Sequence, residues 1–340
     1  MHYSTLPGLL AVTLGLLAAP AFAQGKLTLY CSSDEAWCQQ AKTEFEKKTG
    51  IAVDMTRKSS GETYAQIKAE SANPKGDIWW GGTGDPHLQA AEEGLTQAYV
   101  SETRTQLHDW ANRQAVASKV RTVGIYSGAL GYGYNEELLK KQNLPVPACW
   151  KDLIKPVYKG KIVMPHPSSS GTGFLDVTAW PQLFGEAEGW KYMDALHENI
   201  AIYQHSGSAP CRSAGTGEFP IGIGFEFRAN QVKSTGAPID LVFPKEGLGW
   251  DMEATAILKT TKNMDAAKAL ADFAVTQEAN ELYAKAYAVT ALPGVAKQLP
   301  NIPANYTQLL VKNDFAWAAK NRDRILTEWN KRYNGKAAPK

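Results

Sequence analysis

Three serines, a threonine and two glycines stand side by side at positions 168–173, in the order Ser-Ser-Ser-Gly-Thr-Gly. The apolar residues 162–164 before them predict a buried strand that ends at Pro165, and Phe174 after them begins a predicted helix. Free N–H groups of a first helical turn, the helix dipole and the hydroxyls would together favour a bound anion. The same residue types also make an ordinary helix N-cap, so the segment alone supports either an anion site or a cap.

Three further predicted strands, residues 26–31, 51–59 and 77–82, also end in small polar residues. Each is followed by a helical pattern, and this βαβαβα order calls for a parallel sheet with right-handed crossovers. Open α/β sheets bind ligands at the carboxyl ends of their strands. Ser33, Ser60 and Thr83 are therefore candidate ligand contacts, although each could instead cap a helix or a turn.

Extended passages at residues 121–134, 242–258 and 287–295 separate two α/β bodies. A chain that crosses three times between two lobes needs such passages, and a cleft would then lie between the lobes. We expect residues 24–124 with 251–292 to form lobe 1, and residues 125–250 with 293–340 to form lobe 2. The apolar stripe of residues 306–333 predicts one C-terminal helix.

The first 23 residues predict a secretory signal, because a Leu- and Ala-rich run ends in the small-x-small pattern Ala21-Phe22-Ala23. Its beginning carries no Lys or Arg, which is unusual for such a signal. We expect cleavage after Ala23 and a periplasmic, monomeric protein. The net charge of +2 argues against nucleic acid or a membrane surface as the main partner.

Four cysteines in an exported chain suggest two disulfides, and three pairings are possible. We expect the local pair Cys31–Cys38 and the distant pair Cys149–Cys211. No Cys-x-x-Cys motif occurs and the histidines are scattered, so we expect no metal site.

The export signal and the segments 234–247 and 261–294 resemble the periplasmic substrate-binding proteins of ABC importers. Within them, the chain is similar to the branch of the ferric-ion-binding proteins, which also includes sugar-phosphate and 2-aminoethylphosphonate binders. The resemblance implies an α/β, two-lobed type II fold with a mainly parallel sheet in each lobe and three hinge crossings. It further implies a protein that delivers a solute to a membrane permease, without catalysis or cofactor.

The iron binders of this branch are similar to one another in using adjacent tyrosines, and this sequence has no Tyr-Tyr pair. The phosphate- and phosphonate-binding members resemble it at residues 168–174, after the first strand and at residues 81–83. Carried over by that resemblance, one group of residues would hold the anionic head: Ser33, Ser60, Thr83, Ser169, Ser170, Gly171 and Thr172. His205, Ser206 and Glu226 would face the other end of the ligand, with Glu226 on a strand at residues 222–227.

The sequence therefore predicts a solute-binding protein for a small organophosphorus anion, either 2-aminoethylphosphonate or a sugar phosphate. A ferric-iron-binding protein is the alternative. An exported hydrolase of phosphate esters is a third hypothesis, but it would need an activated nucleophile or a metal cluster, and no Gly-x-Ser-x-Gly motif is present.

Overall fold

The computed structural model describes residues 25–296 and 299–339. The predicted signal segment lies outside these residues. Among the helices of the described part, none is both long enough and apolar enough to span a membrane.

The first part of the chain forms the predicted alternation of strands and helices. Its elements are β1 (Lys26–Cys31), α1 (Glu35–Thr49), β2 (Ala52–Arg57), α2 (Ser60–Ala69), β3 (Ile78–Thr83) and α3 (Gly84–Glu92). Strand β1 pairs in parallel with β2 on one side and β3 on the other. The carboxyl ends of these strands therefore meet at one edge, as expected. A 3-10 helix, η1 (Glu102–Gln106), and α4 (Asp109–Ala117) follow.

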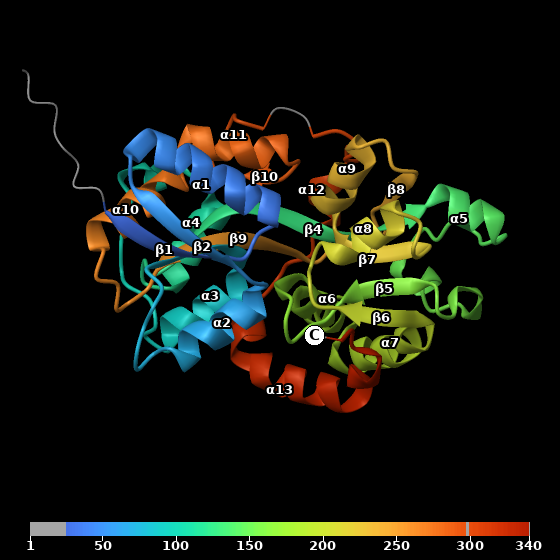
Figure 1. Ribbon diagram of the computed structural model, residues 1–340. Helices are drawn as coiled ribbons and strands as arrows, with labels where there is room; N and C mark the ends of the chain where they lie inside the picture. Colours follow the sequence, from blue (N-terminus) through green and yellow to red (C-terminus); the bar gives the residue numbers. More distant parts are fainter. Residues whose placement is uncertain (1–24, 297–298, 340) are drawn as a thin grey trace, which may run out of the picture.

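One long strand, β4 (Val123–Asn135), joins the two halves of the molecule (Figure 1). Its first part pairs antiparallel with β9 (Trp250–Ile257) and with β10 (Val289–Thr290). From Leu130 onward it pairs with β7 (Ile221–Phe225) and β8 (Ile239–Val242). The strand order is β2-β1-β3-β9-β4-β7-β5-β6. We call β2, β1, β3, β9 and their helices the first half, and β7, β5, β6 and their helices the second half.

The second half repeats the same principle. It contains α5 (Glu136–Lys141), η2 (Trp150–Asp152), η3 (Pro156–Tyr158), β5 (Ile162–Pro165), α6 (Gly171–Phe184), α7 (Glu186–Asn199), β6 (Ile200–Gln204), α8 (Ala209–Gly215) and α9 (Glu226–Ser234). Strand β5 pairs in parallel with β6 and β7. The predicted strand and helix around the hydroxyl-rich segment are therefore β5 and α6.

The C-terminal part returns to both halves. Helices α10 (Met264–Phe273) and α11 (Gln277–Lys285) lie on the first half, as Figure 1 shows. The predicted single tail helix is wrong: α12 (Tyr306–Leu309) and α13 (Phe315–Tyr333) are separate, and η4 (Asn334–Lys336) follows. The chain breaks because the backbone of residues 309–311 pairs with Leu248, and the Asp314 side chain caps the new helix at Trp317 N.

The expected local disulfide Cys31–Cys38 is present, with an S–S distance of 2.01 Å. The expected pair Cys149–Cys211 is wrong, because both residues are free and buried. Cys149 precedes η2, where its carbonyl accepts a hydrogen bond from Tyr132 Oη. Cys211 lies in α8 against Gly222 and Gly224, so separate packing environments hold the two thiols.

Candidate ligand-binding site

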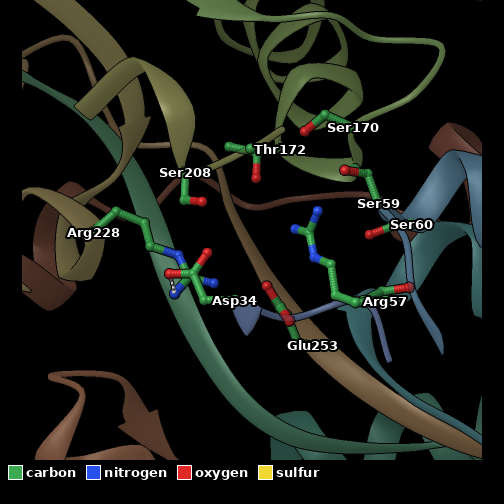
Figure 2. A pocket seen from close by; sticks show the side chains of 12 residues that line it. Asp34, Arg57, Ser59, Ser60, Ser170, Thr172, Ser208, Arg228 and Glu253 are labelled. Carbon is green, nitrogen blue, oxygen red and sulfur yellow. Dashed lines mark hydrogen bonds and ion pairs between the residues drawn. The ribbon is translucent and has the colours of Figure 1, made fainter. Parts of the chain in front are cut away.

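A small polar cavity lies where the strand ends of the first half meet the helix starts of the second half (Figure 2). Its volume is about 20 Å³, which is room for roughly one water molecule. The lining is almost entirely hydroxyl, charged and glycine residues: Ser32, Asp34, Arg57, Ser59, Ser60, Ser170, Gly171, Thr172, Gly207, Ser208, Arg228 and Glu253. Both halves of the molecule contribute residues to this lining, so they lie close together at the cavity, and we call this the closed arrangement.

Direct hydrogen bonds hold the two halves together beside the cavity. Gly61 N donates to the Ser169 carbonyl at 3.0 Å, and Ser59 Oγ donates to the His205 carbonyl at 3.0 Å. A Cβ atom on Gly171 would lie 2.0 Å from Thr83 Oγ1. Only glycine at this position lets the start of α6 approach the end of β3 so closely.

Two helices begin at the cavity, one from each half. Ser170 caps α6 and accepts a hydrogen bond from Gly173 N, while Ser59 and Glu62 form a capping box at the start of α2. Helix N-termini carry partial positive charge and free N–H groups, which favour a bound anion. The Thr172 hydroxyl beside them forms no hydrogen bond within the described residues.

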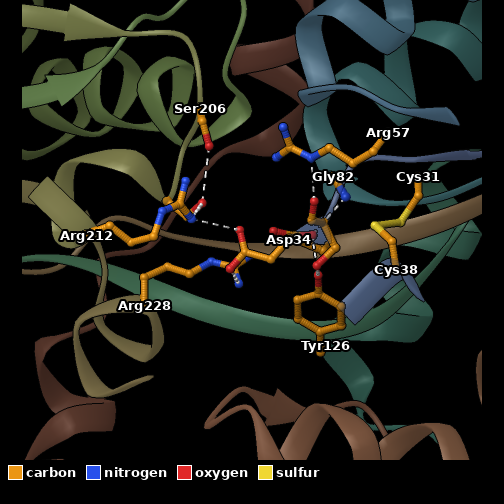
Figure 3. Close-up of polar contacts among 12 residues, drawn as sticks. Cys31, Asp34, Cys38, Arg57, Gly82, Tyr126, Ser206, Arg212 and Arg228 are labelled. Carbon is orange, nitrogen blue, oxygen red and sulfur yellow. Dashed lines mark hydrogen bonds and ion pairs between the residues drawn. A yellow bond between two sulfur atoms is a disulfide. The ribbon is translucent and has the colours of Figure 1, made fainter. Parts of the chain in front are cut away.

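Arg228 and Asp34 form a buried ion pair across the two halves (Figure 3). The Arg228 guanidinium also lies over the Trp37 and Phe227 rings, at 4.4 and 4.6 Å. Burial alone would raise the pKa of Asp34, but Arg228, with Ser208 and Arg212, outweighs burial and holds that pKa below its usual value. Asp34 is therefore an ionised carboxylate whose charge is already matched.

Arg57 differs from Arg228, because its charge has no carboxylate partner. Its Nε donates to the Ser33 carbonyl at 2.9 Å, which orients the guanidinium. It forms no ion pair with any carboxylate of residues 25–296 and 299–339. Figure 2 shows it beside Ser59 and Ser60 in the cavity. An unmatched guanidinium beside two helix N-termini suits a phosphoryl or carboxylate group.

A larger cavity of about 650 Å³ adjoins the small one and shares Asp34, Arg57, Ser208 and Arg228 with it. Its other lining residues include an aromatic ring, a further arginine and uncharged polar groups: Trp37, Arg212, Ser206 and Gln231. Its size lies within the usual range for small-ligand sites. Together, the small cavity could bind an anionic group and the larger cavity could hold the rest of a ligand.

Four of the predicted residues line the small cavity: Ser60, Ser170, Gly171 and Thr172. Ser33, Thr83 and Ser169 lie next to it, and Ser206 lines the larger one. His205 lines neither cavity: its Nδ1 is 2.9 Å from Ser169 Oγ and its Nε2 is 2.9 Å from the Ala338 carbonyl. The histidine thus braces the loop before α6, rather than facing the space that the cavity offers.

Glu226 does not face either cavity. Strand β7 ends at Phe225 and Glu226 is the first residue of α9, so the strand alternation expected for it does not apply. Its carboxyl group is buried against β4, where Oε2 accepts from Ala129 N at 2.6 Å and Oε1 from Tyr306 Oη at 2.7 Å. Burial raises the pKa of Glu226 to about 7.

This shift predicts a pH-dependent stability. Because the pKa of Glu226 in the folded protein lies above the ordinary glutamate value of 4.5, the stabilisation is complete below that value and is lost as pH rises through about 7. We expect a loss of about 3 kcal/mol from this group alone. Glu226→Gln can still accept from Ala129 N through its carbonyl and can donate to Tyr306 Oη through its amide, and it should flatten this part of the pH profile. Urea unfolding at about pH 5 and 8 measures it; the exposed Glu137→Gln is the control, and profiles of equal slope would contradict the assignment.

The sequence argument missed the other cavity residues: Ser32, Asp34, Arg57, Ser59, Gly207, Ser208, Arg228 and Glu253. Arg57 and Ser59 stand in the polar segment after β2, so a search for charged groups at strand ends would have found Arg57. Glu253 carries no local signal, because it lies within β9. Arg228 lies in the first turn of α9, directly after β7, but this strand was expected to continue to residue 227, which hid the helix start. Only the folded chain brings them to the same cavity.

Comparison with known proteins identifies the family. Residues 74–318 match the family described as bacterial extracellular solute-binding protein. An uncharacterized protein of Haemophilus influenzae is 38% identical over 280 residues, which cover 80% of this chain and 81% of that protein. A putative 2-aminoethylphosphonate-binding periplasmic protein of Salmonella typhimurium is 28% identical, over 54% of this chain and 52% of its own length.

The solved structure of the periplasmic binding protein AfuA from Actinobacillus pleuropneumoniae, with exogenous fructose-6-phosphate bound, superposes with a TM-score of 0.86. It is 35% identical and covers 92% of this chain and 99% of its own. Iron-bound HitA from Pseudomonas aeruginosa, at 20% identity and a TM-score of 0.74, shares the fold. The expected two-lobed type II α/β fold is thereby confirmed. These neighbours are substrate-binding transport proteins and not enzymes, and the chain belongs to the bacterial extracellular solute-binding protein family.

Proposed function

We propose that this periplasmic binding component of an ABC importer carries a small organophosphorus anion, a phosphate monoester or a phosphonate. The observation that supports this most is Arg57, whose unmatched guanidinium lies with serine hydroxyls and two helix N-termini in one closed cavity. Such donors bind a phosphoryl group tightly because each hydrogen bond is charge-assisted and water is excluded.

Two relatives support the same chemistry through their names. One solved neighbour contains fructose-6-phosphate, and one relative is named as a putative 2-aminoethylphosphonate-binding protein. The cavity pair suits such ligands, since the small cavity would expand to hold the phosphoryl group and the larger one has room for the organic part. We infer that Ser33, Thr83 and Ser169, which lie next to the small cavity, would position the hydroxyl and N–H donors that line it.

Closure would be a hinge motion between the two proposed lobes, residues 24–124 with 251–292 and residues 125–250 with 293–340. The hinge would lie in the crossing passages that contain β4, β9 and β10. A ligand bound to donors of both lobes favours the closed state by its differential affinity for it. The released solute would pass to the importer's permease.

Ferric iron is the alternative ligand. A hard cation requires several converging anionic oxygens, but no group of three or more His, Cys, Asp or Glu side chains within the described ranges could hold a metal ion. Of the two carboxylates that line the small cavity, Asp34 is already matched by Arg228, which leaves only Glu253, fewer anionic oxygens than a hard cation requires.

A thermal-shift screen tests the proposal. It compares 2-aminoethylphosphonate, fructose 6-phosphate, glycerol phosphate, inorganic phosphate and ferric citrate, since a ligand that binds only the folded state raises the melting temperature. We expect a rise with at least one organophosphorus compound and none with ferric citrate. A rise with ferric citrate alone would contradict the proposal.

Thr172→Val should weaken binding of the best organophosphorus compound about tenfold, because it removes one hydroxyl donor without changing the side-chain shape. Titration calorimetry measures the affinity. Lys47→Ala, in the exposed last turn of α1, is the control and should bind as the parent does. Equal affinity of Thr172→Val and the parent would show that this hydroxyl does not face the ligand.

A further inference from the structure

An acidic side chain in an anion cavity needs a physical reason, and Glu253 is such a side chain. It reaches the cavity from β9 and is only 5% exposed. Figure 2 shows its carboxyl group between Asp34 and Arg57. Asp34 is matched by Arg228, but Glu253 forms no ion pair within the described residues. An ionised Glu253 would repel a bound anion.

The orientation of Glu253 is fixed by one of its two oxygens. Oε2 accepts from Gly82 N at 2.8 Å and from Tyr126 Oη, and Tyr126 Oη lies 2.8 Å from Ser33 Oγ. Oε1 accepts no hydrogen bond from the described residues. Because Glu253 lines the cavity, Oε1 is the oxygen available to a ligand.

The groups around Glu253 come from every element packed against it. They are Tyr126 on β4, Arg228 on α9, Arg57 at the end of β2, Asp34 before α1, Tyr283 on α11 and Asp251 on β9 itself. Burial raises the pKa of Glu253, and Asp34 adds to that rise, while Arg228 and the hydrogen bonds from Tyr126 and Gly82 oppose it without cancelling it. A proton on this carboxyl group is therefore less unfavourable than in water.

We infer that Glu253 is a specificity residue: in the complex, its Oε1 and a phosphoryl oxygen of the ligand share one proton. This inference rests on the proposed organophosphorus ligand. Two ionised oxygens in contact repel each other, whereas one proton between them makes a short charge-assisted hydrogen bond. A phosphate monoester has a second pKa near 6, so it can bring the proton itself at low pH. Otherwise the proton comes from Glu253 or from solvent, and the complex holds one proton in each case.

Sulfate esters and sulfonates have the same shape but carry no proton near neutral pH. They cannot supply the proton, and because their oxygens are much weaker bases than phosphoryl oxygens, they accept a proton from Glu253 far less strongly. Glu253 therefore stays ionised and repels them, or forms only a weak hydrogen bond with them. The site would therefore favour phosphonates and phosphate monoesters over their sulfur analogues, although the surrounding hydroxyls and N–H groups suit both. Specificity of this kind comes from an unfavourable contact with the wrong ligand.

Two matched pairs of probes test this inference: 2-aminoethylphosphonate with 2-aminoethanesulfonate, and fructose 6-phosphate with fructose 6-sulfate. Titration calorimetry at about pH 8, in two buffers of different ionisation enthalpy, gives both the affinity and the protons taken up. We expect the parent to bind a phosphorus compound at least about 100-fold more tightly than its sulfur analogue. We also expect an uptake approaching one proton, because a phosphate monoester is largely doubly ionised at this pH and the proposed open state would expose Glu253 to water, where a glutamate is ionised.

Glu253→Gln places an N–H donor where the shared proton would be. Its carbonyl can still accept from Gly82 N and Tyr126 Oη. We expect the preference for phosphorus over sulfur to fall at least about tenfold and the proton uptake to disappear. Glu137→Gln, an exposed change on α5, should behave as the parent.

The outcomes separate the inference from the proposed function. A parent that binds a phosphorus compound without proton uptake, and equally well its sulfur analogue, overturns the role of Glu253 and leaves the proposed function standing. That measurement needs no variant, so it holds even if Glu253→Gln does not fold. A parent that binds neither phosphorus compound overturns the proposed function, and the inference with it.

Discussion

Replacement of Arg57 by glutamine is expected to weaken binding of the organophosphorus ligand at least about 100-fold, which corresponds to about 3 kcal/mol. Among the described residues the Arg57 guanidinium forms no direct ion pair, although it also lowers the pKa of Asp34 from a distance, so most of its charge is available to the ligand. Arg228 makes a smaller net contribution, since Asp34 already matches its charge. Titration calorimetry with the best compound of the screen measures the loss.

Two further variants make the Arg57 result specific. Lys58→Gln removes the same charge one residue away, but Lys58 is exposed, so its affinity should equal that of the parent. Arg57→Lys keeps the charge and loses the planar fork, and should give an intermediate affinity. The effect of Arg57→Gln should persist at high salt, because salt screens a closed cavity poorly. If Arg57→Gln and Lys58→Gln bind alike, Arg57 does not contact the ligand.

The sequence predicted most of the architecture, because its elements depend on local signals. The periodicity of residues 26–94 and the glycine-rich run that became β4 identify the parallel strands and the crossing strand. The tail could not be predicted in this way. Residues 309–311 have helical neighbours, but their backbone pairs with Leu248, some 60 residues away in sequence, and such a tertiary contact overrides local propensity.

The residues of the candidate site also fall into those that local sequence pattern predicts and those that it does not. Ser60, Ser170, Gly171 and Thr172 stand where strands end and helices begin, so sequence pattern could find them. Glu253 lies within a strand, with no local signal for a cavity, and Arg228 was missed because the start of α9 after β7 was not recognised. Glu226 was misplaced because a single residue decides whether β7 continues or α9 begins. Boundaries of elements are the least predictable feature of a sequence.

A buried ion pair between α13 and α3 offers the second large effect. Arg322 donates to Asp85, both side chains are almost fully buried, and the guanidinium lies 4.2 Å from the centre of the Phe174 ring on α6. Helix α13 is anchored to the second half through Trp329, which packs on Tyr203 and His166. Arg322 therefore connects the C-terminal helix to the first half.

A second carboxyl group, Asp251 on β9, lies near Asp85 and is also buried. Burial raises the pKa of Asp251 well above its usual value, and the charge of Asp85 raises it further. Burial also raises the pKa of Asp85, but the Arg322 guanidinium opposes that rise. Arg322 therefore favours the negative charge on Asp85 and the proton on Asp251. This cluster then has one positive charge, on Arg322, and one negative charge, on Asp85.

Asp85→Asn should lower the free energy of unfolding by about 3–5 kcal/mol, because it leaves the Arg322 charge buried without a partner. Arg322→Met should have a smaller effect, since Asp85 can then take up a proton, and the double variant should lose less than the sum of the two. Urea unfolding measures all three, as urea does not screen charges.

The matched control for this pair lies on the same helix. Arg324 pairs with Glu186 at 2.6 Å, but both side chains are about half exposed. Exposed pairs contribute little, so Arg324→Gln should change the free energy of unfolding by no more than about 0.5 kcal/mol. If Asp85→Asn and Arg324→Gln have equal effects, water reaches Arg322 in solution. The contact between α13 and α3 would then open more readily than its burial in the closed arrangement implies.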